Sequence, residues 1–438
     1  MNTSPVDFQA NLAPEEAKLG ESARVAGAMR GFAREIGALS ALRLDACVHC
    51  GMCADACHFY IVTEDPQYTP VLKVEPFKQV FKREAGAFAP VFRWFGLKAK
   101  ITGAELARWQ HLLYDSCNLC GRCSLMCPMG IDIAELIEQA RRGMFEAGLA
   151  PKELYEKAAH QRRTGQPEPS DEPYRDKLLA IGRRFNVEIP LDKPRAEVLL
   201  TVPRTDIEHY PAAVAALVRV MAHLKADCTF RSDGLVAENY GYYAGGRDWQ
   251  REISRRLIDQ AVACQAKVLI VPECGHAYSA LRWEAAELMG KSLPFKVLHI
   301  TEYLAEALEA GRLRLRTAQV GATAFHDPCQ LVRKGGITAA PRQLLRAMGI
   351  EPRETVRHIG YNICCGGGGG VFDIERAATL RHRVVEEKFH EIDQTGAQTF
   401  LTTCSDCRRT FDDGKKRFNW ELTPGSLLEL VAEHLQGG

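Results

Sequence analysis

The chain of 438 residues is long enough for two or three domains of about 100–200 residues each. Its 56 lysine and arginine residues balance 55 aspartate and glutamate residues, and the net charge of +1 argues against a nucleic-acid-binding protein. No segment approaches the roughly 18 apolar residues of a membrane span, and the N-terminus lacks a signal-peptide pattern. We therefore expect a cytoplasmic protein that reaches the inner face of the membrane only through a partner subunit.

Two runs of four cysteines stand in the N-terminal third of the chain. Each has the spacing Cys-x2-Cys-x2-Cys-x3-Cys, typical of bacterial two-cluster ferredoxins, in which the fourth cysteine of each run ligates the other cluster. The ligands predicted for the first 4Fe–4S cubane cluster are Cys47, Cys50, Cys53 and Cys127. Those predicted for the second are Cys117, Cys120, Cys123 and Cys57. Zinc sites and disulfides are the alternatives, although zinc sites usually use paired Cys-x2-Cys knuckles.

The residues around these runs predict an α-helical module over residues 1–159. Residues 12–44 place apolar side chains at helical spacing, which indicates an amphipathic helix packed on the cluster domain. Residues 58–116 are longer than the spacer of a minimal ferredoxin, and the module resembles the iron–sulfur domain of succinate dehydrogenase. An apolar run at residues 87–97 either docks on a membrane subunit or packs in the core, and we expect core packing.

The remainder of the chain predicts an α/β fold. Residues 160–195 are polar and contain prolines, so we predict an interdomain linker there. After it, short apolar runs alternate with helical segments, which indicates parallel strands. Segments 201–204 and 267–278 align with 326–329 and 398–409, which indicates two copies of one unit. The predicted fold class is α+β overall: a helical two-cluster ferredoxin-like domain, then a duplicated α/β domain with its copies at residues 196–310 and 311–438.

The second copy carries five more cysteines, one more than a cubane cluster needs. They are Cys329, Cys364, Cys365, Cys404 and Cys407. The surplus thiolate indicates chemistry at the cluster and not electron storage alone. In the first copy Arg204 and Ala277 stand opposite Cys329 and Cys407, and only Cys274 survives, opposite Cys404.

A cysteine, a Cys-Cys-Gly sequence and a Cys-x2-Cys pair in this order resemble the CCG domain of heterodisulfide reductase catalytic subunits. With a ferredoxin-like module ahead of a degenerate first copy, the chain resembles the HdrD, DsrK and TmcB proteins of this family, and segments 273–277, 326–329 and 364–370 are most similar to DsrK. The resemblance implies that the five cysteines hold one noncubane 4Fe–4S cluster, which cleaves a disulfide with electrons from the two cubane clusters.

The resemblance also implies partners. The substrate would be a disulfide or trisulfide, on a small thiol or on a DsrC-like sulfur-carrier protein. Electrons would be exchanged with a membrane haem b or quinone subunit similar to DsrM or HdrE, or with an electron-transfer flavoprotein.

Several residues beside the cysteines are candidates for assisting the chemistry. Backbone N–H groups can approach the cluster at Gly366, Gly367 and Gly368, unless this run is only a flexible loop. If the two copies pack face to face, Cys274 and His276 line the cavity opposite the cluster. We predict His276 as proton donor to the departing thiolate, the alternative being a histidine that stabilises its own loop. His326 is expected to orient the cluster.

Two functions of different class remain open. In the first, the protein is a heterodisulfide reductase-like enzyme. In the second, it is a non-catalytic electron-transfer subunit of a flavoprotein dehydrogenase that passes electrons to quinone. Relatives of the second kind usually keep two intact CCG copies, so the degenerate first copy favours the enzyme. Cys228 and Cys264 have no ligand spacing, and we expect buried free thiols.

Overall fold

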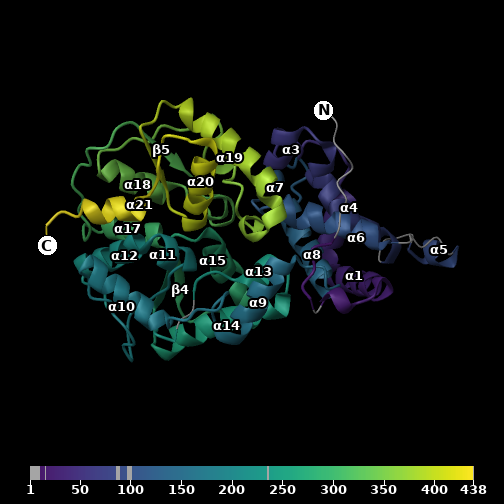
Figure 1. Cartoon of the computed structure of the whole chain (residues 1–438), viewed down its shortest axis with the longest axis horizontal. Coiled ribbons are helices and arrows are strands. Elements are labelled where there is room, and N and C mark those ends of the chain that lie inside the picture. Colours follow the sequence, from purple (N-terminus) through teal and green to yellow (C-terminus); the bar gives the residue numbers. More distant parts are fainter. Residues whose placement is uncertain (1–9, 15, 85–88, 96–100, 234–235, 438) are drawn as a thin grey trace. The chain divides into compact units, whose positions relative to one another are not determined.

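The computed structural model describes residues 10–14, 16–84, 89–95, 101–233 and 236–437 (Figure 1). The chain divides into two compact units. The first comprises residues 1–159 together with 240–250 and 368–384, and the second comprises residues 160–239, 251–367 and 385–438. None of the described helices combines the length and the apolar character that crossing a membrane requires.

The first unit is helical. Its elements are η1 (Glu16–Lys18), α1 (Glu21–Glu35), α2 (Ala38–Ala46), α3 (His58–Thr63), η2 (Pro66–Tyr68), α4 (Pro70–Glu84), α5 (Ala89–Trp94), α6 (Gly103–Gln110), η3 (His111–Asp115), α7 (Arg122–Leu125), α8 (Ile133–Glu146), α13 (Tyr240–Ala244), η7 (Val371–Asp373) and η8 (Glu375–Ala377). Helices α9 (Lys152–Thr164), α14 (Arg247–Ala263) and α19 (Ala378–Asp393) begin in this unit and end in the second.

Helices α1 and α8 pack against each other in the first unit. A Cβ atom added at Gly31 would lie 2.8 Å from the Cα atom of Gly143, so both glycines allow the backbones to approach. Phe32 is fully buried beside them. The helix predicted over residues 12–44 is divided at Ile36–Gly37 into α1 and α2.

The expected core packing of the apolar run at residues 87–97 is wrong for the side chains that can be described. Val91, Trp94 and Phe95 are 47%, 82% and 63% exposed. The short helix α5 contacts α4, yet these three side chains remain exposed. Residues 87–88 and 96–97 of the run lie outside the described residues.

The second unit contains two parallel sheets, as the α/β pattern predicts. The first sheet has the order β2-β1-β3-β4 and the second β5-β6-β7, and every adjacent pair is parallel. The strands are β1 (Val198–Leu200), β2 (Cys228–Thr229), β3 (Val268–Val271), β4 (Lys296–His299), β5 (Thr323–His326), β6 (Thr399–Thr402) and β7 (Pro424–Ser426). The series β1-β3-β4 and β5-β6-β7 repeat one topology, which confirms the duplicated α/β fold.

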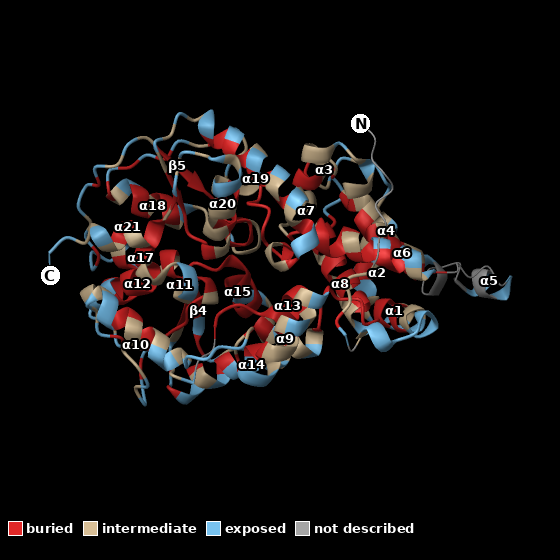
Figure 2. Ribbon diagram, viewed as in Figure 1, coloured by how far each residue is buried: buried red, intermediate tan, exposed pale blue. Residues whose placement is uncertain are grey.

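Helices cover both sheets, and the two copies share one core. The helical elements of this unit are α10 (Tyr174–Phe185), α11 (Arg204–His209), α12 (Pro211–His223), α15 (Gly275–Ser279), η4 (Ala280–Glu284), α16 (Ala285–Met289), α17 (Ile300–Glu309), η5 (Gln330–Lys334), α18 (Ala339–Ala347), η6 (Ile359–Tyr361), α20 (Ser405–Phe418) and α21 (Leu427–Glu433). Helix α12 packs on α21, and α17 on α18, so helices of the first copy meet helices of the second. Figure 2 shows α12 and α15 among the buried elements.

Two segments of the C-terminal half belong to the first unit. In the first copy residues 239–241 align with the Cys-Cys-Gly motif, and the segment 240–250 begins within them; in the second copy residues 368–384 begin just after the motif itself. Each copy therefore contributes a segment at or just after this position to the helical first unit. Residues 160–195, predicted as a linker, lie in the second unit, where α10 packs against α12.

Candidate iron–sulfur sites

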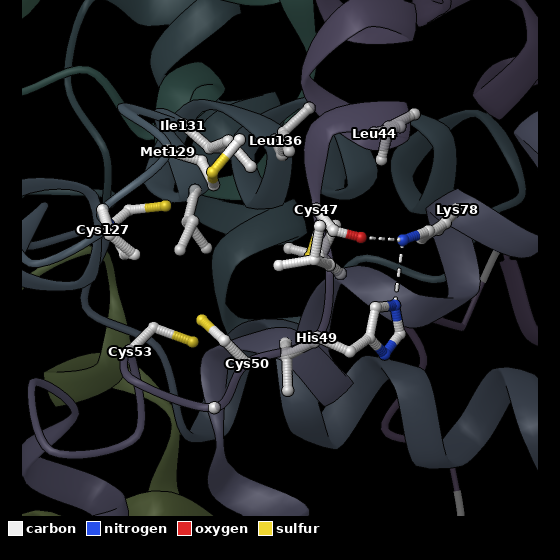
Figure 3. A pocket seen from close by; sticks show the side chains of 16 residues that line it. Leu44, Cys47, His49, Cys50, Cys53, Lys78, Cys127, Met129, Ile131 and Leu136 are labelled. Carbon is white, nitrogen blue, oxygen red and sulfur yellow. Dashed lines mark hydrogen bonds between the residues drawn. The ribbon is translucent and has the colours of Figure 1, made fainter.

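The four cysteines assigned to the first cubane cluster line one pocket of about 580 Å³. Figure 3 shows the sulfur atoms of Cys50, Cys53 and Cys127 directed into a common space, with Cys47 on its far side. Leu44, Ile131 and Leu136 complete an apolar wall. Helix α2 ends at Ala46 with Cys47 as its C-cap residue, and a left-handed turn at Gly51 brings the next cysteines back towards it. Cys50 is exposed, so solvent reaches this site.

The four cysteines assigned to the second cluster line a separate pocket of about 350 Å³. They are Cys57, Cys117, Cys120 and Cys123. His58, which replaces the proline that usually follows such a run, begins α3 and is buried. Its Nε2 atom lies 2.5 Å from Oδ1 of Asn118, so it connects the two cysteine loops.

The electrostatics of these pockets fit a metal cluster. Burial raises the pKa of Cys53 to about 11 and raises the pKa values of Cys117 and Cys123. At neutral pH such thiols stay protonated unless a metal cation replaces the proton, because a coordinated thiol is deprotonated outright. Eight cysteines divided into two pockets of four could hold two 4Fe–4S clusters with the predicted exchange of the fourth ligand.

The glycine run after Cys365 is packed and not a free loop. Asn118 Nδ2 donates to the carbonyl of Gly368 at 2.9 Å, and Arg141 Nη1 donates to that of Gly369 at 2.8 Å. A Cβ atom at Gly369 would lie 2.8 Å from the backbone of Asn118. The predicted cofactor residue Gly368 therefore contacts the loop that carries Cys117, within the first unit.

The other two predicted glycines belong to the second unit. Gly366 has a φ of +93°, which other residues rarely adopt. A Cβ atom at Gly367 would lie 2.1 Å from Oγ1 of Thr410 on α20. Gly366 therefore favours glycine for its backbone conformation, and Gly367 requires it because the backbone passes close to the helix that carries Cys407.

The five cysteines of the second copy are all buried and form one connected set. Cys329 Sγ lies 3.6 Å from Cys364 Sγ. Hydrogen bonds with Cys364 and Cys407 lower the pKa of Cys365 to about 6, while hydrogen bonds with Cys365 and Cys404 raise the pKa of Cys407. One thiolate is thus stabilised by neighbouring thiols even before a metal binds, and the thiolate is the form that ligates iron.

The sequence folds so that loops after two strands converge on this set. Cys329 follows β5, and Cys404 is the N-cap residue of α20 directly after β6. Asp327 accepts two hydrogen bonds from Arg342, at 2.9 and 2.8 Å, and fixes the loop before Cys329. Arg333 donates to Asn362 Oδ1 at 2.8 Å and fixes the loop before Cys364. The Arg333 guanidinium therefore helps to position the loop that carries Cys364.

His326 lies with these cysteines. One nitrogen of its imidazole ring and the Sγ atoms of Cys365 and Cys407 all lie within 4.8 Å of one another. The histidine is 1% exposed, and none of the described residues forms a hydrogen bond with either of its nitrogens. Burial, with Lys388 and Arg333 nearby, lowers its pKa well below the usual range, so the ring is neutral. A neutral imidazole next to the thiolates can donate to sulfur.

The first, degenerate copy contacts the second, intact copy at the loops that follow β3 and β6. Cys274 is the N-cap residue of α15 after β3, as Cys404 is of α20 after β6. The backbone N–H of Ser405 donates to the carbonyl of Glu273 at 2.8 Å, so the two cap loops lie against each other. Cys274 is buried, and burial raises its pKa well above the usual value. His276 is buried in the first turn of α15.

Three buried carboxyl groups next to this contact were not among the predicted site residues. They are Asp206, Glu238 and Glu273. Burial raises the pKa of Glu273 to about 7 and that of Glu238 to about 8, and it raises that of Asp206 well above its usual value. Each carboxylate accepts a hydrogen bond. Asp206 accepts one from Ser405 Oγ, and Glu273 accepts one from Ser426 Oγ at 2.5 Å. Glu238 accepts one from the backbone N–H of Arg204 at 2.7 Å. The Arg204 guanidinium pairs with Glu168 and Glu208. In the sequence only the position of Glu273, at the end of an apolar run, hints at this group.

Comparisons with known proteins agree with this arrangement. The model of a 4Fe-4S dicluster domain matches residues 43–131, and that of a cysteine-rich domain, CCG, matches residues 323–412. The chain is 26% identical to a subunit of the dihydromethanophenazine:CoB--CoM heterodisulfide reductase of Methanosarcina barkeri, over 92% of this chain and 96% of that one. It is also 26% identical to the Hdr-like menaquinol oxidoreductase iron-sulfur subunit of Archaeoglobus profundus, over 90% and 79%. With the EtfAB:quinone oxidoreductase of Syntrophomonas wolfei it shares 26% identity, over 86% of this chain but 56% of that one.

The raised carboxyl pKa values predict that stability falls as pH rises. An unfolded glutamate titrates near 4.5, whereas Glu273 and Glu238 titrate near 7 and 8 in the folded chain. Between these pH values the folded chain binds more protons than the unfolded chain does. The contribution of these two groups to the free energy of unfolding is therefore fully present below about pH 4.5, and it is lost as the pH rises to about 8.

The melting temperature of the cluster-loaded protein should fall between about pH 5 and about pH 8.5. In Glu273→Gln, which removes one ionisation, the fall should be smaller by a few degrees. Glu421→Gln, at an exposed position, should behave as wild type. An equal fall in all three proteins would contradict the burial effect.

Proposed function

Because the chain is an HdrD/DsrK-like iron–sulfur oxidoreductase subunit, we propose that it reduces or oxidises a disulfide- or trisulfide-type bond at the five-cysteine site. The observation that carries the proposal is the connected, buried set of five thiols, one more than a cubane cluster uses. The similarity to a heterodisulfide reductase subunit over nearly the whole chain supports it.

In this proposal each cysteine set holds one cluster. The two four-cysteine pockets hold the cubane clusters, and the five cysteines around Cys365 hold the noncubane cluster. When bound, the noncubane cluster supplies iron that accepts thiolate sulfur and transfers single electrons. His326, neutral and adjacent to Cys365 and Cys407, would donate its N–H to a sulfur atom of the bound cluster and so orient the site.

The reaction also needs protons. Reduction of R–S–S–R′ by two electrons breaks the sulfur–sulfur bond, and two protons convert the two thiolates to R–SH and R′–SH. We assign the final transfer to His276, with Cys274 lining the same side of the site. Burial raises the pKa of Glu273 to about 7 and that of Glu238 to about 8, so both carboxyl groups can carry and release a proton close to that loop near neutral pH.

The sulfur chemistry can be tested by electron paramagnetic resonance of oxidised, cluster-loaded protein treated with candidate thiols. We expect a thiol-dependent S = 1/2 signal that broadens with 33S-labelled thiol, because substrate sulfur would bind directly at iron. Cys407→Ser should lose the signal, whereas Cys264→Ser, a buried thiol in the core, should keep it. If no candidate thiol produces the signal, the protein is an electron carrier and not the enzyme.

Replacing His276 tests the proton transfer. His276→Gln keeps a polar side chain of similar size but cannot donate a proton in this way, so disulfide reduction should slow by about 100-fold or more. The thiol-dependent signal should remain, since sulfur binding does not need the histidine. Unchanged turnover of this variant across the pH range would remove His276 from the mechanism.

The electron partner would dock at the first cubane pocket. Cys50 is exposed there, and Val48 and Met129 at the pocket are 66% and 52% exposed. Relatives named as a menaquinol oxidoreductase subunit and as an EtfAB:quinone oxidoreductase support a membrane quinone subunit, with a flavoprotein as the second candidate. A non-catalytic electron carrier would use the same face.

A charge at this face should disturb protein partners only. Val48→Glu should slow cluster reduction by quinol-containing membranes of the source cells, or by reduced electron-transfer flavoprotein, whichever is the donor. Reduction by dithionite should be unchanged. Val262→Glu, which places the same charge at an exposed position in the second unit, is the control. Equal rates for both variants would exclude this docking face.

A further inference from the structure

One helix places a buried lysine at each of the two cubane pockets. Lys73 lines the pocket of the second cluster and Lys78 that of the first, and both belong to α4. They are 1% and 5% exposed. Buried lysines are rare unless their charge is balanced, so both positions need an explanation.

The surroundings of Lys73 leave a positive charge directed at the cluster. Its Nζ atom lies 3.4 Å from the Sγ atom of Cys57 and donates to the carbonyl of Ser116. The Nζ atom also lies 5.1 Å from the centre of the Phe59 ring. Arg141, also buried, donates to the carbonyl of Cys117 at 2.7 Å. These acceptors are neutral apart from the cysteine, whose thiolate would ligate iron.

Lys78 has different surroundings. Its Nζ atom donates to the carbonyl of Cys47 at 2.8 Å and lies 2.9 Å from Nε2 of His49 (Figure 3). His49 in turn lies 3.6 Å from a carboxylate oxygen of Glu75, whose charge opposes that of the lysine. Cys50 of the same pocket is exposed, so water screens the charge further.

We propose that Lys73 raises the reduction potential of the second cubane cluster above that of the first. Reduction adds one electron to an anionic cluster, and a buried cation beside a ligand sulfur stabilises the added charge. Without the cation, the more buried cluster would be the harder one to reduce, because burial disfavours the extra charge. Electrons arriving at the exposed first cluster then pass to the second. The inference rests on the proposed cluster ligands and not on the disulfide chemistry.

The test is a redox titration of the cluster-loaded protein followed by electron paramagnetic resonance. In Lys73→Met, the midpoint potential of one cubane cluster should become more negative while that of the other stays unchanged. Lys73→Arg keeps the charge and should stay near wild type. Lys82→Met, on the exposed side of the same helix, should shift neither potential. Unchanged midpoints in Lys73→Met, or equal shifts of both clusters, would overturn the proposal.

Wild-type protein provides a second test that needs no variant. A water-soluble dysprosium complex enhances the relaxation of the cluster nearer solvent, which is the first cluster because Cys50 is exposed. That cluster should have the lower midpoint potential. The reverse order would overturn the proposal even if Lys73→Met fails to assemble its clusters. Neither result depends on thiol binding, so failure here and failure of the disulfide chemistry can be distinguished.

Discussion

The first unit depends on one buried guanidinium. Arg141 on α8 is fully buried and donates to carbonyl oxygens of three chain segments: to Cys117 at 2.7 Å, to Tyr243 at 3.1 Å and to Gly369 at 2.8 Å. Only arginine offers five donors in a fixed plane, so no other side chain could join these segments at once. Because all of these acceptors are neutral, the positive charge is left for the anionic cluster that the Cys117 loop would hold.

This interaction explains why both α/β copies return to the helical unit. A Cβ atom at Gly245, in the segment from the first copy, would lie 2.6 Å from the carbonyl of Arg141. Gly369, in the segment from the second copy, meets Asn118 in the same way. Both glycines have positive φ, so each segment contacts the cubane region through a backbone that only glycine adopts easily. The second segment, residues 368–384, follows Cys364 and Cys365 closely in the chain. It therefore connects the five-cysteine site covalently to a segment that contacts the loop carrying Cys117.

Local patterns in the sequence were enough to predict some of this structure. Metal-ligand spacing is a local property, so the grouping of Cys127 with Cys47 and of Cys57 with Cys117 could be proposed before any fold was known. The repeated order of short strands and cysteine loops likewise predicted the duplicated α/β architecture. Both predictions needed only the order of residues along the chain.

Contacts between distant segments could not be read in the same way. Nothing near Lys73 in the sequence indicates that its ammonium lies beside Cys57, since a lysine on an amphipathic helix usually faces water. Trp94 is exposed although it stands in an apolar run, and apolar content alone does not reveal which side chains of such a run meet the core. The partners of Arg141 lie as far along the chain as Gly369, and a single sequence carries no sign of them.

The degenerate copy has not simply lost its function. Its acids stand beside the former ligand positions: Glu238 precedes the residue aligned with Cys364, Glu273 precedes Cys274, and Asp206 follows Arg204, which is aligned with Cys329. All three carboxyl groups are buried, and burial raises their pKa values, so each of them holds a proton to a higher pH than an exposed carboxyl group does. A second anionic cluster facing the first would repel it within a poorly screened interior, whereas protonated acids do not. In the proposed reaction the intact copy would hold electrons and the acids of the degenerate copy would hold protons, and cleavage of a sulfur–sulfur bond to two thiols consumes both.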